Sequence, residues 1–191
     1  MKKLRLFLPL LFVLSLALFA CATPPTEEMN RAHDAVIRAE NDADAVTYAP
    51  TTLIRARDAL VRMQVEAEAK RYDEARNFAN EAINSAERAI SEGRTGAGRA
   101  RDEATRLIDS LAVPLAETET AVNAARGRPL LVDYNTLRGE MDSTRRTYED
   151  ARRDLQATNY QDAINRGQIV RSNLAAINAQ LTGAAQAITR K

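Results

Sequence analysis

The sequence predicts an all-α protein of five or six helices arranged in antiparallel hairpins. After residue 28, apolar residues recur at alternating spacings of three and four, which is the pattern of one helix face. The chain has no sustained period-two alternation and few β-branched runs, the patterns that mark strands. Breaks in the helical pattern are expected at Pro and Gly, because both disrupt a helix interior. These breaks fall at Pro50, Gly93–Gly98, Pro114 and Gly127–Pro129.

The first twenty residues have the composition of an export signal. Basic residues at positions 2, 3 and 5 precede an apolar run, Leu6–Ala20, that ends in a small residue. This run is shorter than the roughly twenty apolar residues that a membrane-spanning helix needs. We therefore assign residues 1–20 to a signal peptide.

The signal ends in Leu18-Phe19-Ala20-Cys21, and Cys21 is the only cysteine of the chain. This ending resembles the lipobox of bacterial lipoproteins. The resemblance implies that Cys21 is acylated, becomes the mature N-terminus and anchors the protein to a membrane through two or three acyl chains. It also implies, from Ala22, an outer-membrane lipoprotein that faces the periplasm. Residues 21–28 would then form a lipid-anchored tether.

Two other fates of this segment stay open. Ala20-Cys21-Ala22 also fits the small-x-small site of ordinary signal peptidase, which would cut before Thr23 and release the protein. The second alternative is an anchor that is never cleaved. A lone cysteine in an exported chain needs an explanation, and acylation supplies one.

The charge of the mature chain argues against nucleic-acid binding. Without the three basic residues of the signal, 27 − 3 = 24 basic and 26 acidic residues remain, a net charge of −2. No basic field is left to attract a phosphate backbone. Much of the apolar content is Ala, which buries little area per residue, so we expect closely packed helices instead of a thick core.

Residues 29–92 are expected to form one helical domain of three segments. The second segment should begin at Pro50, because proline suits the first turn of a helix. The three apolar stripes are Met29, Ala32, Val36, Ala39, Ala43 and Val46; then Leu53, Ala56, Leu60, Met63 and Ala67; then Tyr72, Ala75, Ala79, Ala82, Ala86 and Ala89.

Residues 93–191 are expected to form a second helical region with a C-terminal hairpin. Gly93, Gly96 and Gly98 predict a loop or a weakened helix at its start. The helix that follows should end or kink at Pro114. Two long helices come last. Their stripes are Tyr134, Leu137, Met141, Thr144, Tyr148, Ala151 and Leu155, and Tyr160, Ala163, Gly167, Val170, Leu174, Ile177, Leu181, Ala184 and Ile188.

An internal repeat links the two regions. Arg71-Tyr72-Asp73-Glu74-Ala75 is similar to Asn159-Tyr160-Gln161-Asp162-Ala163, and each opens a helix after a long preceding one. The sequence therefore predicts two related hairpins. Two interpretations remain: a two-lobed binder in which Tyr72 and Tyr160 contact a partner, or a Tyr-x-x-Ala start that serves close helix packing.

Two groups of residues between positions 43 and 89 form a pattern. They are Tyr48-Ala49-Pro50 with Leu53, Ala56 and Leu60, and Arg71-Tyr72-Asp73-Glu74-Ala75 with Ala79, Ala82 and Ala86. This pattern resembles a family of uncharacterised bacterial envelope proteins with a helical domain of unknown function. Lys70-Arg71 stands where a Gly-Asp turn is more usual in that family. Its members are commonly lipoproteins, and the resemblance implies no catalytic residue.

Few residues could carry chemistry. His33 is the only histidine, and we expect it to be a partly buried structural residue beside the first stripe. Asp42 and Asp44 lack the glycine and distal glutamate of a calcium loop, so we expect a solvated helix end there. The glycine-dense stretch 93–98 lacks the spacing and lysine of a phosphate loop. The sequence thus predicts no enzyme, no metal and no cofactor.

Lys191 ends the chain after a long helix. This ending resembles that of the small major outer-membrane lipoprotein, which is joined to peptidoglycan through its terminal lysine. An ordinary cation at a helix C-terminus, where it favours the helix dipole, is the alternative.

The sequence therefore predicts a non-enzymatic envelope lipoprotein that acts as a scaffold, adaptor or spacer through its helical surfaces. The expected partners are the membrane, through acylated Cys21, and another protein or further copies of the chain. A peptidoglycan-associated or wall-linked protein is the first alternative. A carrier of an apolar ligand is the second.

Overall fold

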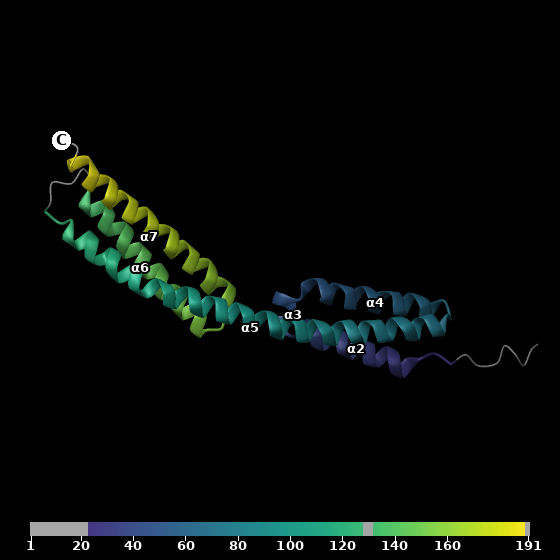
Figure 1. Ribbon diagram of the computed structural model, residues 1–191. Helices are drawn as coiled ribbons and strands as arrows, with labels where there is room; N and C mark the ends of the chain where they lie inside the picture. Colours follow the sequence, from purple (N-terminus) through teal and green to yellow (C-terminus); the bar gives the residue numbers. More distant parts are fainter. Residues whose placement is uncertain (1–22, 128–131, 190–191) are drawn as a thin grey trace, which may run out of the picture. The chain divides into compact units, whose positions relative to one another are not determined.

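The computed structural model describes residues 23–127 and 132–189. These residues form six helices and no strand, which confirms the all-α prediction (Figure 1). Two compact units divide the chain, residues 1–94 and 95–191, and α5 contributes residues to both. The helices are α2 (Thr26–Glu40), α3 (Ala43–Tyr48), α4 (Pro50–Glu68), α5 (Tyr72–Ala124), α6 (Tyr134–Gln156) and α7 (Tyr160–Thr189).

The first unit packs α2, α3 and α4 against the first part of α5 (Figure 1). α4 begins at Pro50, as predicted. Small side chains fill most of the core, so the helices approach closely, and Leu53 and Met63 are its bulkier members. The fully buried alanines of this core are Ala32, Ala39, Ala45, Ala56, Ala79, Ala82, Ala86 and Ala89.

The first predicted segment is two helices instead of one. α2 ends at Glu40, and α3 starts two residues after Asn41. Asp42 causes the new start, because its side chain accepts a hydrogen bond of 2.9 Å from the Ala45 amide and caps α3. The apolar spacing continues across this break, and for that reason periodicity alone missed it.

The sequence predicts a loop or a weakened helix at Gly93–Gly98, and the loop is wrong, since α5 continues through all three glycines. The backbone of α3 explains the glycine at position 93. A Cβ there would lie 2.5 Å from the Ala45 amide nitrogen and 2.6 Å from the Asp44 carbonyl carbon. Gly93 therefore permits a close contact between two helices and does not mark a turn.

Pro114 does not end a helix either, because α5 runs on to Ala124. Proline removes the hydrogen bond that the Ser110 carbonyl would otherwise accept. Pro114 is exposed, so this carbonyl lies on the solvent side of the helix. Water can satisfy it there, which makes the proline tolerable in the helix interior.

The second unit packs α6 and α7 with the rest of α5. Its core holds larger side chains than the first, including Leu137, Val170 and Ile177. A polar pair also lies between α5 and α7: the Asn178 amide donates a hydrogen bond of 2.9 Å to the hydroxyl of Thr118, which is 2% exposed.

Both hairpins turn in the same way. Lys70 between α4 and α5 has φ +60°, and Thr158 between α6 and α7 has φ +62°. In each turn, the next residue donates its amide to a carbonyl five positions earlier. These bonds join Arg71 to Glu66 and Asn159 to Asp154, each 2.9 Å long. This pattern is a Schellman motif, which usually places glycine at the left-handed position.

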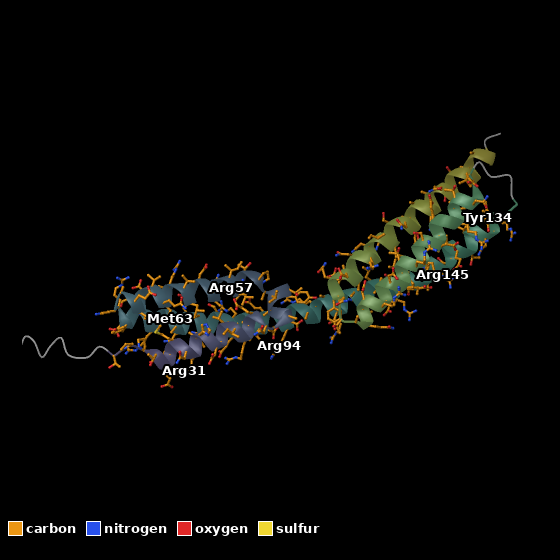
Figure 2. The ribbon with its side chains drawn as sticks, turned by 180° about the vertical axis from the view of Figure 1, so that it is seen from behind. Arg31, Arg57, Met63, Arg94, Tyr134 and Arg145 are labelled. Carbon is orange, nitrogen blue, oxygen red and sulfur yellow. The ribbon has the colours of Figure 1, made fainter. Side chains whose placement is uncertain are left out.

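The two turns lie 88 positions apart (158 − 70 = 88), and other contacts keep this offset. The Thr52 hydroxyl donates to Glu92 across the first hairpin, and Gln180 donates to Glu140 across the second. In one ion pair of each unit the arginines also keep the offset: Arg57 of α4 pairs with Glu40 of α2, and Arg145 of α6 pairs with Glu119 of α5, although these two glutamates lie 79 positions apart (119 − 40 = 79). Figure 2 labels both arginines. The structure thus supports the predicted relation between the hairpins and extends it to a third helix in each unit.

Candidate functional site

The side of α4 that points away from the core carries three large apolar residues. Ile54, Val61 and Val65 are 53%, 58% and 53% exposed. Their spacings of seven and four place them on one helix face, opposite the buried Leu53 and Met63. Single exposed apolar residues are common, whereas an aligned set of three is a candidate contact surface. We call Ile54, Asp58, Val61 and Val65 the α4 outward face.

The second unit provides an internal comparison, because α6 occupies the place of α4 there. The residues 88 positions after Ile54, Val61 and Val65 are Asp142, Glu149 and Arg153. All three are exposed, as expected for a face in contact with water. Each also forms an ion pair within α6. The pairs are Arg138–Asp142, Arg145–Glu149 and Arg153–Asp150.

The α4 outward face has charged residues beside and within it. Asp58 lies between Ile54 and Val61, and Arg55 and Arg62 flank Asp58 three positions before and four positions after it. In the described part of the chain, neither Asp58 nor Arg55 forms an ion pair within 4.0 Å. The Arg62 guanidinium lies 5.8 Å from the centre of the Phe78 ring, a cation–π distance that orients this arginine.

Polar grooves run along the hairpins beside these faces. The groove between α4 and α5 is lined by amides at positions 77, 80 and 84 and by Arg55, Arg62 and Glu81, and it shares Ile54 and Asp58 with the α4 outward face. The groove between α6 and α7 is lined by residues such as Glu140, Asn173 and Gln180. Both grooves hold polar and charged side chains, so they differ from the apolar pockets that enclose small ligands.

Several predicted site residues lie outside or at the margins of these surfaces. Cys21 and Lys191 are outside the described residues, so acylation and wall attachment stay predictions. Tyr72 and Tyr160 are partly buried at the starts of α5 and α7, just after the two Schellman turns. The structure brings them to equivalent places in the two units, and both interpretations of them remain.

His33 is exposed on α2, so the predicted partial burial is wrong. The reason is its position on the helix: Ala32, Ala35 and Val36 form the buried face, and His33 points away from it. Within the described ranges, no three of the residues His, Cys, Asp and Glu come close enough to hold a metal ion. None of the described helices is long and apolar enough to span a membrane.

The clearest surface feature, the α4 outward face, was absent from the sequence-based predictions. A signal for it exists, because three β-branched residues follow a helical spacing out of phase with the stripe of Leu53, Ala56, Leu60 and Met63. A second apolar stripe on one helix indicates a second contact.

The comparisons with known proteins identify part of the chain. Residues 27–105 match the family model described as Domain of unknown function (DUF4398). This stretch of the chain is therefore similar to an uncharacterised domain family, which agrees with the resemblance found between positions 43 and 89. No curated protein and no solved structure gives a significant match.

Proposed function

We propose that this protein is a non-enzymatic lipoprotein of the bacterial cell envelope that acts as a scaffold or adaptor. In this proposal, acylated Cys21 holds it to a membrane and the α4 outward face binds another polypeptide. The observation that carries the proposal is the difference between equivalent faces. α6 bears Asp142, Glu149 and Arg153 where α4 bears Ile54, Val61 and Val65.

Physical chemistry favours a contact at this face. Burying apolar surface contributes about 25 cal/mol per Å², so three half-exposed β-branched side chains gain free energy when a partner covers them. The three side chains gain none of this free energy while they stay exposed to water. α6 also shows that this architecture accepts charged residues at the three equivalent positions. The apolar residues of α4 are therefore not required by the fold of a three-helix unit.

The α4 outward face suits a helix or another elongated apolar surface better than a small molecule. Its apolar side chains stand in a row over twelve residues of helix, from Ile54 to Val65, with Asp58 in the middle. Such a row gives the i, i+7 and i+11 anchors that helices use to bind one another. A spacer or adaptor role needs this kind of surface and no reacting groups.

Photo-crosslinking in living cells tests the proposed contact. A photoreactive amino acid replaces Val61 in the full-length protein, and the same replacement of Glu149 is the matched control on α6. We expect a discrete crosslinked species from position 61 and at least tenfold less from position 149. Equal yields, or no product from position 61, would show that the α4 outward face has no partner.

The membrane anchor has a separate test. Mass spectrometry of the mature N-terminal peptide should find Cys21 as the first residue, carrying acyl chains. An unmodified peptide that begins at Thr23 would contradict the lipoprotein part of the proposal and leave the α4 contact untouched. Periplasmic orientation at the outer membrane is tested by fractionation of the cell envelope.

A further inference from the structure

We infer that the partner on the α4 outward face is the same face of a second copy of this chain, with the two α4 helices antiparallel. This inference rests on the proposed function, because it names the occupant of that contact surface. Two properties of the described residues carry it. They are the symmetry of the spacing along the face and the arrangement of its charges.

The spacing of the α4 outward face reads the same in both directions. Ile54, Asp58, Val61 and Val65 are separated by four, three and four residues. A twofold axis between positions 59 and 60 therefore places Ile54 opposite Val65 of the second copy. It also places Asp58 opposite Val61 of the second copy. A self-complementary surface of this kind is what an isologous dimer requires.

The charges fit the same arrangement. Asp58 stands in the middle of the apolar row and forms no ion pair with a described residue. A partner that covers the row removes water from this carboxylate, which is costly unless a cation meets it. Arg62 follows Val61 directly, so the antiparallel pair brings Arg62 of the second copy beside Asp58. Because the twofold axis relates the two copies, the same contact occurs twice, and two Asp58–Arg62 ion pairs form.

Arg62 is held beside the α4 outward face by a contact within its own chain. Its guanidinium lies over the Phe78 ring, 5.8 Å from the ring centre, and this contact limits the positions of a long side chain. The equivalent residues of α6 differ in both respects. Arg146 replaces Asp58 there, and Asp150 replaces Arg62 but pairs with Arg153 and Arg166 within its own unit. Of these two helices, α4 alone thus presents an acid within an apolar row that pairs with no described residue.

The interface should be small. α4 has 19 residues and is therefore about 28 Å long, and four positions on each copy form the seam. Such a contact falls at or below the lower end of specific protein interfaces, so the dimer should be weak and concentration-dependent. Holding the copies at one surface raises their effective concentration and strengthens such a contact.

Charge exchange between positions 58 and 62 tests the inference. Two differently tagged full-length copies are produced in the same cells and crosslinked there, and recovery of one tag with the other is then measured after extraction. Asp58→Arg alone and Arg62→Asp alone should each lower this recovery at least tenfold, because like charges then meet across the axis. The double variant Asp58→Arg/Arg62→Asp should recover to within about twofold of the original protein. Copies of the double variant should fail to pair with the original chain.

The control is Arg146→Asp at the equivalent place on α6, which should leave recovery unchanged. Circular dichroism of each variant checks that its helices remain. Single variants that pair as well as the original protein would overturn the inference, as would a folded double variant that does not recover. A position-61 crosslink to a different protein, with no effect of the charge exchange, would retain the contact surface and refute the second copy as its occupant.

Discussion

Gly93 of α5 and Ala45 of α3 approach so closely that no other side chain fits between their backbones. A Cβ at position 93 would lie 2.5 Å from the Ala45 nitrogen and 2.7 Å from its Cα. Backbone atoms cannot rotate away as a flexible side chain can. This glycine therefore fixes how near α3 packs to α5 in the first unit, within the stretch that matches the DUF4398 model.

Gly93→Ala should destabilise the first unit by about 1–3 kcal/mol, the usual cost of inserting atoms into a close-packed contact. Gly98→Ala is the matched control on the same helix, because no atom lies within 4 Å of a Cβ there. That substitution should stabilise the protein by about 0.5–1 kcal/mol, since alanine favours helix. Denaturant unfolding followed by circular dichroism measures both. Equal effects of the two substitutions would contradict the close contact.

Lys70→Gly and Thr158→Gly should each stabilise the protein, by roughly 0.5–1 kcal/mol. Both residues have a positive φ, which costs an L-residue about 1–2 kcal/mol and glycine very little. The gain is smaller than that cost because glycine loses more conformational entropy on folding. Chemical denaturation of the two variants tests whether the turns are equivalent. A loss of stability at either position would contradict the left-handed turn.

Asn178→Ala should destabilise the second unit by about 1–3 kcal/mol. The substitution leaves the buried Thr118 hydroxyl without the amide that donates to it, and an unsatisfied buried polar group is costly. Adding Thr118→Val should recover part of the loss, because it removes the orphaned group. A double-mutant cycle measures the coupling, and additive effects would show that the pair does not interact.

The Asp133 cap of α6 should make the free energy of unfolding depend on pH in the acid range. Hydrogen bonds from the Thr136 hydroxyl and the Asn135 amide lower the pKa of Asp133 below its ordinary value. A lowered pKa means that the stabilisation is present above the unfolded-state value of about 3.9 and is lost as the pH falls through the folded-state value. Asp133→Asn keeps a capping side chain that does not titrate. Thermal unfolding between pH 7 and pH 2.5 should show a smaller decline for this variant, and parallel curves would contradict the role of the cap.

The sequence correctly predicted several helix starts, because the residues at and next to a helix start determine it. Pro50 fits only the first turn of a helix, and α4 begins there. The Tyr72 and Tyr160 starts also lie where the repeat placed them. At Gly93 the loop, one of the two predicted outcomes, is absent, and at Pro114 the helix end, again one of two, is absent, because a distant backbone and a solvent-facing carbonyl decide those positions. Neither effect can be seen in the residues next to them.

The α4 outward face, the proposed contact surface, was harder to find from sequence than the fold. Val61 and Val65 look like ordinary members of an amphipathic helix until the core is known to use Leu53 and Met63 instead. The comparison with α6 also depends on the equivalence of the two units. That equivalence became firm only when both turns showed the same left-handed residue and the same hydrogen bonds.

The most direct test of the α4 outward face is to replace its apolar residues with the charged residues at the equivalent positions of α6. The variant Ile54→Asp/Val61→Glu/Val65→Arg places on α4 the residues found at positions 142, 149 and 153. Sedimentation of the full-length protein, solubilised from the membrane in detergent and measured at high protein concentration, should show the original chain in a larger complex and the variant as a single copy. Helical content should be equal in both. A folded variant that sediments in the same complex as the original would contradict the account.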